Sequence, residues 1–469
     1  MNRLRPLLFL LLALPPLRAA AQEWGSVSGG LESNSVWSVD GSFRSNNYLK
    51  LDYVKGRFSA GIQGEYYPEP LLGYDLNLKG IGLPGKYIAW TEKNWSLTAG
   101  DFYDQFGSGI LLRSWEDRDL GWNNSIGGGR FTWNSANELL SMKVLGGFTR
   151  RYLCYSSDRL AGAGLTLRPL EGFSLEGNAV VRHDGVTPAQ GSWSVLSSYE
   201  AGGFNARAEW VGKPGGNAQL LELGYAAGHF SSALTMRRLD RMADPMGMNY
   251  LPSLCLEQTY TLASLNPYTT CAAGELGGAA NLFDRHGTWK FHANGSMIYA
   301  LPAALQNHDV LRLAYRDINL EVEKRWNKRL KTVAFVSIQE NSPTHGERKA
   351  TNAQNAFVLD GVYKTARKLS LRMQLQYLYS RELTKDWMAA LLEVSSTAGW
   401  SVHVQDLYNH GSTGEHYYDA GVSWTKGGLK LDLSYGHQRA GLVCSGGVCR
   451  WQPEYTGGML RLVYQFATR

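Results

Sequence analysis

Long apolar runs are missing from this chain beyond its first residues. A transmembrane helix needs about 18 or more consecutive apolar residues, and no later stretch approaches that length. At the start, two arginines precede an apolar run (7–14), and small residues follow at 19–21. This is the pattern of a secretory signal peptide. We therefore predict that residues 1–21 are removed before Gln22, and that the mature protein is exported without a helical membrane anchor.

Strong net charge and internal boundaries are missing as well. The formal charge of +6 falls to +3 once Arg3, Arg5 and Arg18 leave with the signal peptide, which argues against nucleic acid as a partner. No linker, low-complexity tract or shift in composition interrupts the rest of the chain. We therefore expect residues 22–469 to form a single domain.

Signatures of catalysis and metal binding are also lacking. No GxSxG, HExxH or phosphate-binding glycine loop stands in a suitable context. His403 and Asp406 have odd spacing on an expected strand, as do His416 and Asp419, so the members of each pair face opposite sides. We expect no catalytic residues, no metal site and no cofactor, and a membrane-embedded hydrolase is only a minor alternative.

What the chain does contain is alternation between apolar and polar residues. Its 53 glycines, 25 tyrosines and 15 tryptophans suit tight turns and aromatic rings at a membrane interface. In the clearest segment, Leu371, Met373, Leu375 and Tyr377 alternate with Arg372, Gln374 and Gln376. Such a period of two predicts a strand with one apolar and one polar face. Similar segments recur from end to end.

The connections between these segments alternate between short turns and longer loops, which is typical of an outer-membrane barrel. We predict an all-β fold, a closed antiparallel transmembrane β-barrel of about 24 strands, within a range of roughly 20–26. Short turns would be periplasmic and long loops extracellular. A soluble all-β protein is the alternative, but closure of a barrel removes the exposed edges that such a series of strands would leave.

One connection, residues 100–130, is long and mixes charges of both signs with aromatic side chains. Long ordered loops are usually functional, and a barrel of this width leaks unless something fills it. We predict that this segment folds into the lumen, with its charges paired and with Trp115 and Trp122 against the wall; a surface loop is the alternative. The candidate constriction residues are Asp101, Asp104, Arg113, Trp115, Glu116, Asp117, Arg118, Asp119 and Arg130.

Five cysteines permit disulfides in an oxidising compartment. Cys444 and Cys449 flank a glycine-containing turn and form the first candidate pair. Cys255 and Cys271 share one expected loop and form the second, which leaves Cys154 over. The spacing in CSGGVC is not that of a thioredoxin-like redox site, so a structural role is the default.

Three strings, GDFYDQFGSGILLRSWEDRDLGWNNS, KRWNKRLKT and YGHQRAGLVCSGGVCR, resemble an uncharacterised outer-membrane β-barrel family of Bacteroidota. The resemblance covers essentially the whole mature chain and implies location and fold. The family has no assigned substrate or reaction, so the resemblance implies no site residues.

Two functions fit these features. The first is a pore or transporter in the outer-membrane lipid, for an unidentified small solute, whose lumen is restricted by segment 100–130. The alternative is a non-transporting surface or assembly component that binds a surface or periplasmic protein through extracellular loops 240–273 and 440–452.

Overall fold

The alternating segments form one 24-stranded sheet in the computed structural model, which describes residues 25–468 apart from 306–309, 349–350, 367, 382–384 and 446–447. The predicted signal peptide lies outside the described residues. The barrel strands are β1 (Ser26–Ser38), β2 (Phe43–Lys55), β3 (Phe58–Glu69), β4 (Gly80–Thr91), β5 (Trp95–Phe102), β10 (Ile126–Asn134), β11 (Leu140–Arg151), β12 (Cys154–Leu170), β13 (Phe173–His183), β14 (Gln190–Ala201), β15 (Phe204–Lys213), β16 (Gly216–Ala227), β17 (Phe230–Asp240), β18 (Gly274–His286), β19 (Trp289–Ala300), β20 (Arg312–Arg325), β21 (Leu330–Asn341), β22 (Asn352–Lys364), β23 (Leu369–Ser380), β24 (Trp387–Ser396), β25 (Trp400–Tyr408), β26 (His416–Lys426), β27 (Leu429–Gln438) and β30 (Tyr455–Ala467).

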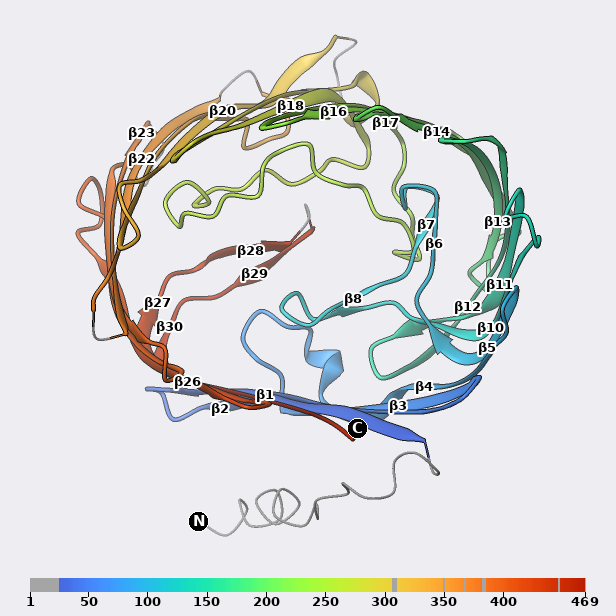
Figure 1. The fold of residues 1–469 in the computed structure, drawn as a ribbon, viewed down its shortest axis with the longest axis horizontal. Coiled ribbons are helices and arrows are strands. Elements are labelled where there is room, and N and C mark those ends of the chain that lie inside the picture. The colour runs from blue at the N-terminus through green and yellow to red at the C-terminus, as the bar shows by residue number, and fades with distance from the viewer. Residues whose placement is uncertain are drawn as a thin grey trace.

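The sheet closes on itself through its first and last strands. β1 pairs antiparallel with β30, with Leu31 opposite Tyr464, and all other neighbouring strands are antiparallel too. β5 pairs directly with β10, and β27 pairs directly with β30, so the chain inserted between each of these pairs does not interrupt the wall. The predicted closed antiparallel barrel is confirmed, and Figure 1 shows it as a ring seen end-on.

The two faces of the wall differ in polarity as the alternation predicts. On β23, Met373 and Leu375 are 56% and 49% exposed on the outside, whereas Gln374 and Gln376 are 6% and 7% exposed on the inside. Because lipid offers no hydrogen bonds, a membrane-spanning sheet must close and must turn apolar side chains outward. The outer face of this barrel meets both requirements. No helix in the described part of the chain is long and apolar enough to cross a membrane.

The connections at the two ends of the barrel differ in length. At one end, which we call the short-turn end, every connection has two to five residues. At the other, the long-loop end, three connections are much longer: 103–125, 241–273 and 439–454. All three fold back into the ring, together with the shorter connection 70–79 (Figure 1). They carry the remaining elements, which are η1 (Leu76–Leu78), β6 (Gln105–Phe106), β7 (Leu112–Arg113), β8 (Glu116–Asp117), β9 (Trp122–Asn123), β28 (Gly441–Ser445) and β29 (Val448–Gln452); η2 (Pro302–Ala304) lies in another connection.

The inward course of 241–273 and 439–454 corrects the expectation that loops 240–273 and 440–452 stand outside as partner-binding loops. Leu262 and Leu265 of the first loop are buried in one cluster with Phe335 and Leu378 of the wall. Inward-facing wall positions are apolar where such loops cover them, because both surfaces then lose contact with water. Residues 241–273 are therefore partly buried against the wall of their own barrel.

Candidate functional site

Residues 103–125, called the plug here, are seated on the wall by their β6–β7 tip. Phe106 is fully buried, and it belongs to an apolar cluster that includes wall residues of β11–β13 and β15–β17. Next to it, the N–H of Gly107 donates to Glu176 Oε1 (3.2 Å) and that of Ser108 to Glu209 Oε2 (3.0 Å). Gly107 has φ +56°, and a Cβ there would lie 1.9 Å from Glu209 Oε1. Only glycine lets the tip come this close to the carboxylate.

The plug is also joined to the second inner loop, residues 241–273, by main-chain hydrogen bonds. The N–H of Arg113 donates to the carbonyl of Met248 (2.8 Å), and the N–H of Tyr250 donates to that of Gly109 (2.9 Å). The Arg113 guanidinium lies 4.1 Å from the centre of the Tyr250 ring, a distance that favours a cation–π interaction. These contacts make the two segments one connected filling of the lumen.

The two plug tryptophans pack against each other and against an aromatic ring of the second inner loop. The Trp115 ring centre lies 6.3 Å from that of Trp122 and 5.8 Å from that of Tyr250. The aromatic residues thus join one inner segment to another. The sequence reasoning missed this because it had assigned Tyr250 to an external loop.

The acidic residues at the base of the plug pair with the wall. Asp104 accepts a hydrogen bond from Lys143 (2.6 Å) and forms an ion pair with Arg130 (3.3 Å). Asp101 accepts a hydrogen bond from the Tyr155 hydroxyl (2.8 Å). Of the candidate constriction residues, Asp101 and Arg130 thus belong to wall strands. Arg130 holds the base of the plug through Asp104, whereas Asp101 links β5 to Tyr155 of β12.

Arg118 is the plug's main charged link to the first strand. Its guanidinium lies 3.1 Å from Glu116 Oε1 and 3.0 Å from Glu32 Oε2 on β1. Burial disfavours the charge, but these two carboxylates outweigh it and raise the pKa of the guanidinium. Asp117 instead accepts the N–H of Leu120 (3.0 Å) within its own turn.

The hairpin β28–β29 reaches the plug through Arg450. Its Nε donates to the carbonyl of Asp119 (2.7 Å), its Nη1 donates to that of Leu72 (3.2 Å), and the guanidinium lies 4.5 Å from the Tyr74 ring centre. Asp119, one of the candidates, thus contributes its main chain to this contact.

The cysteines follow the sequence expectation in part. Cys444 and Cys449 lie opposite each other in the hairpin and form a disulfide. Cys255 and Cys271 are free thiols, as is Cys154 at the start of β12. The expected second disulfide is therefore absent from the described structure.

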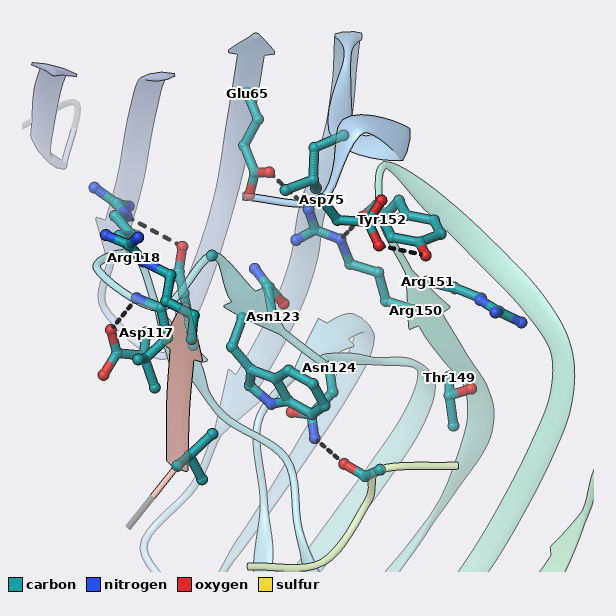
Figure 2. A pocket seen from close by; sticks show the side chains of 18 of the residues that line it. Glu65, Asp75, Asp117, Arg118, Asn123, Asn124, Thr149, Arg150, Arg151 and Tyr152 are labelled. Atoms are coloured by element: carbon teal, nitrogen blue, oxygen red, sulfur yellow. Dashed lines mark hydrogen bonds and ion pairs between the residues drawn. The ribbon is translucent and has the colours of Figure 1, made fainter. Parts of the chain in front are cut away.

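These segments and the wall enclose a cavity of about 660 Å³ toward the long-loop end, which we call the upper cavity. Figure 2 shows charged side chains of both signs pointing into it. The ionisable residues of its lining are Glu65, Asp75, Glu116, Asp117, Asp158 and Asp244 with Arg118, Arg150, Arg151 and Arg450. Its volume is in the range of small-molecule sites.

At the wall of this cavity, Arg150 and Glu65 form a buried ion pair. Arg150 Nη2 lies 2.7 Å from Glu65 Oε2, and the two side chains are 2% and 1% exposed. The Tyr67 hydroxyl donates to the same oxygen at 2.9 Å. Sequence reasoning missed this pair because the two residues are far apart in the chain.

The described residues include no group of three His, Cys, Asp or Glu side chains arranged to hold a metal ion. His403 and Asp406 have different partners on the next strand: His403 Nε2 lies 2.7 Å from Asp419, and His416 Nδ1 lies 2.8 Å from Asp406. The opposite facing predicted from their spacing fits these separate partners.

The sequence matches a known family over nearly its whole length, residues 1–466. The chain belongs to DUF6029, a family of unknown function. No curated protein has significant sequence similarity to it.

Several solved structures share the architecture of this chain at low sequence identity. The P pilus usher (PapC) translocation pore is 11% identical, with 95% of this chain and 99% of that chain covered and a TM-score of 0.48. The copper transporter OprC is 11% identical, with 97% and 81% covered and a TM-score of 0.46. The outer membrane protein opdK from Pseudomonas aeruginosa is 7% identical, with 94% and 98% covered and a TM-score of 0.39. Similarity this distant carries no argument about what this chain does.

Proposed function

We propose that this protein is an integral outer-membrane pore or transporter for a small polar solute, and that its own inner segments restrict the lumen. The observation that carries the proposal is the combination of a very wide wall with a filling built from that wall's own connections. Barrels with 16–18 strands already leave an aqueous channel, and those with 22 are plugged. A wall of 24 strands has to be filled to keep the membrane sealed.

The chemistry of the filling supports a role in passage. Apolar contacts anchor parts of it to the wall, while charged groups of both signs line the upper cavity. Under this proposal the long-loop end faces outside and the short turns face the periplasm. A polar cavity lined by charges of both signs suits small hydrated solutes better than large apolar ones.

The test replaces the plug with a short turn. Since Phe102 and Ile126 are directly paired across β5 and β10, a four-residue Gly/Ser turn can join these strands in place of residues 103–125. We expect a several-fold rise in single-channel conductance in planar bilayers, and faster entry of small sugars into proteoliposomes. The matched control replaces 439–454 between Gln438 and Tyr455, which are also paired.

A folded, plug-deleted barrel with wild-type conductance would overturn the assignment of the plug as the restricting segment. Heat-modifiable electrophoretic mobility reports whether each variant has formed its barrel. That result would favour the alternative function, a surface or assembly component.

A further inference from the structure

A second cavity, of about 400 Å³, lies in the lumen along the same part of the wall as the upper cavity. Its lining comes from β2–β5 and β10 with the base of the plug, and it includes Thr91 and Ser96, which flank the short turn 92–94. We call it the lower cavity. Thus one cavity is lined by the long connections and the other extends toward the short-turn end.

The layer between the two cavities is thin. Gln63 lines the lower cavity and Glu65, two residues further along β3, lines the upper one. Residues two apart on a strand are separated by only about 7 Å. On the plug side, Ser125 lines the lower cavity and its neighbour Asn124 the upper one.

This layer is held by polar contacts. The Gln63 amide donates to Glu65 Oε1 (3.1 Å) on the wall and to Glu116 Oε1 (2.8 Å) on the plug. Beyond these, Glu65 pairs with Arg150, and Glu116 pairs with Arg118. A hydrogen-bonded chain therefore crosses from the wall to the plug and separates the cavities.

The opposite side of the lumen is filled differently. There the second inner loop buries Tyr260 and Leu262 in an apolar cluster with β21–β26, and the ring centres of Tyr260 and Phe335 lie 4.9 Å apart. Passage of a hydrated solute on that side would break a dry, close-packed contact, which costs more than exchanging hydrogen bonds with water.

We propose that the solute passes along β2–β5 and β10–β12, from the upper to the lower cavity, and that the Gln63–Glu116 contact is the gate between them. This inference rests on the proposed function and adds to it the route, the gate and the solute class. The solute is small and polar with low net charge, such as a neutral sugar or a zwitterion, because the lining carries both signs. Opening requires Glu116 to move away from Gln63 while β3 stays in place.

The test compares Gln63→Ala and Glu116→Ala with Gln376→Ala. Gln376 is a matched control, since it is as buried as Gln63 (7% and 8% exposed) and contacts an inner loop on the other side by accepting the N–H of Leu262 (3.0 Å). In planar bilayers, both gate variants are expected to raise the open probability roughly tenfold or more, the ratio that loss of one hydrogen bond to a charged group produces. The control is expected to match the wild type.

A second measurement locates the route independently of gate energetics. In the Glu116→Ala protein with Cys154, Cys255 and Cys271 replaced by serine, a cysteine replaces either Ser59, which lines the lower cavity, or Ser370. These are the second residues of β3 and β23. A bulky, water-soluble methanethiosulfonate reagent added on the short-turn side is expected to block current through Ser59→Cys and to leave Ser370→Cys conducting.

The possible outcomes distinguish an error in the proposed route from an error in the proposed pore or transporter function. Equal opening by Gln376→Ala, or equal block at Ser370→Cys, overturns the route. If plug replacement raises conductance but neither gate variant does, the proposed function stands and the gate is wrong. If plug replacement also leaves the conductance unchanged, the proposed function itself is wrong, and the gate falls with it.

Discussion

Removal of the Phe106 ring should unseat the plug. Phe106 is fully buried at the tip of β6–β7 and is set into a seat made by Gly162 and Gly164 of β12. A Cβ at these glycines would lie 2.6 and 2.9 Å from the ring, so the absence of side chains there creates the seat. Phe106→Ala empties it, and Gly162→Val fills it from the wall side. Both changes should favour the unseated state.

The magnitude follows from the burial. Truncation of a fully buried phenylalanine to alanine costs about 3–5 kcal/mol, which corresponds to a factor of about 10² or more in the ratio of seated to unseated plug. The barrel wall should keep its strand pairing in Phe106→Ala, because Phe106 lies outside the 24-stranded sheet.

The assay is the rate of maleimide labelling of Ser108→Cys, beside the ring, in the purified barrel with the three free cysteines, Cys154, Cys255 and Cys271, replaced by serine. Labelling of this half-buried position should accelerate in Phe106→Ala, because the unseated fraction rises, and conductance should rise with it. Phe357→Ala is the matched control, because this ring is 47% exposed on the outer face. Unchanged labelling of a folded Phe106→Ala barrel would refute the idea that the ring anchors the plug.

Three further predictions concern stability. Arg237→Met removes the ion-pair partner of the fully buried Glu275 and should lower the free energy of unfolding in urea by about 3–5 kcal/mol. Arg372→Met, at a partly exposed ion pair, should lower it by only about 0–1 kcal/mol. Equal losses in the two variants would contradict the burial argument. Cys444→Ser should make the β28–β29 hairpin more susceptible to limited proteolysis. It should lower the free energy of unfolding by at most about 2 kcal/mol, because the loop that the disulfide closes is short. Peptide mass mapping of the unreduced wild type should detect the Cys444–Cys449 disulfide. Burial lowers the pKa of His345, so the folded loop binds this proton less readily than the unfolded chain, whose histidine titrates near about 6.5. The stability of residues 342–348 should therefore be full above about pH 6.5 and decline below it, as hydrogen exchange would show; in His345→Gln this pH dependence should disappear.

The sequence by itself determined the wall. The alternation at Leu371–Tyr377 reports which side chains face outward because a strand's side-chain period of two is a local property that the neighbouring strands do not alter. Closure follows from the same pattern, since an apolar outer face in lipid permits no open edge. The Cys444–Cys449 bond was predictable for a similar reason, because a short hairpin brings its two ends together whatever surrounds it.

The sequence also indicated that the plug enters the lumen, but it did not indicate what the plug would meet there. Trp115 packs on Tyr250, a residue of another connection far along the chain. Gln63 reaches Glu116 across the lumen. Neither pairing leaves a periodic or local trace, so neither can be read from residue spacing.

Only the tertiary structure decided where residues 241–273 and 439–454 go. Leu262 and Leu265 are apolar residues in a long connection, and such residues can be buried against a partner protein or against the chain's own wall. The sheet decides between these, because its 24 strands enclose a space wide enough to take in several connections, and the inward face of β21–β26 offers them Phe335 and Leu378. The same folding keeps Cys255 and Cys271 as separate thiols. The course of each connection thus depends on a cavity that exists only once β1 has paired with β30.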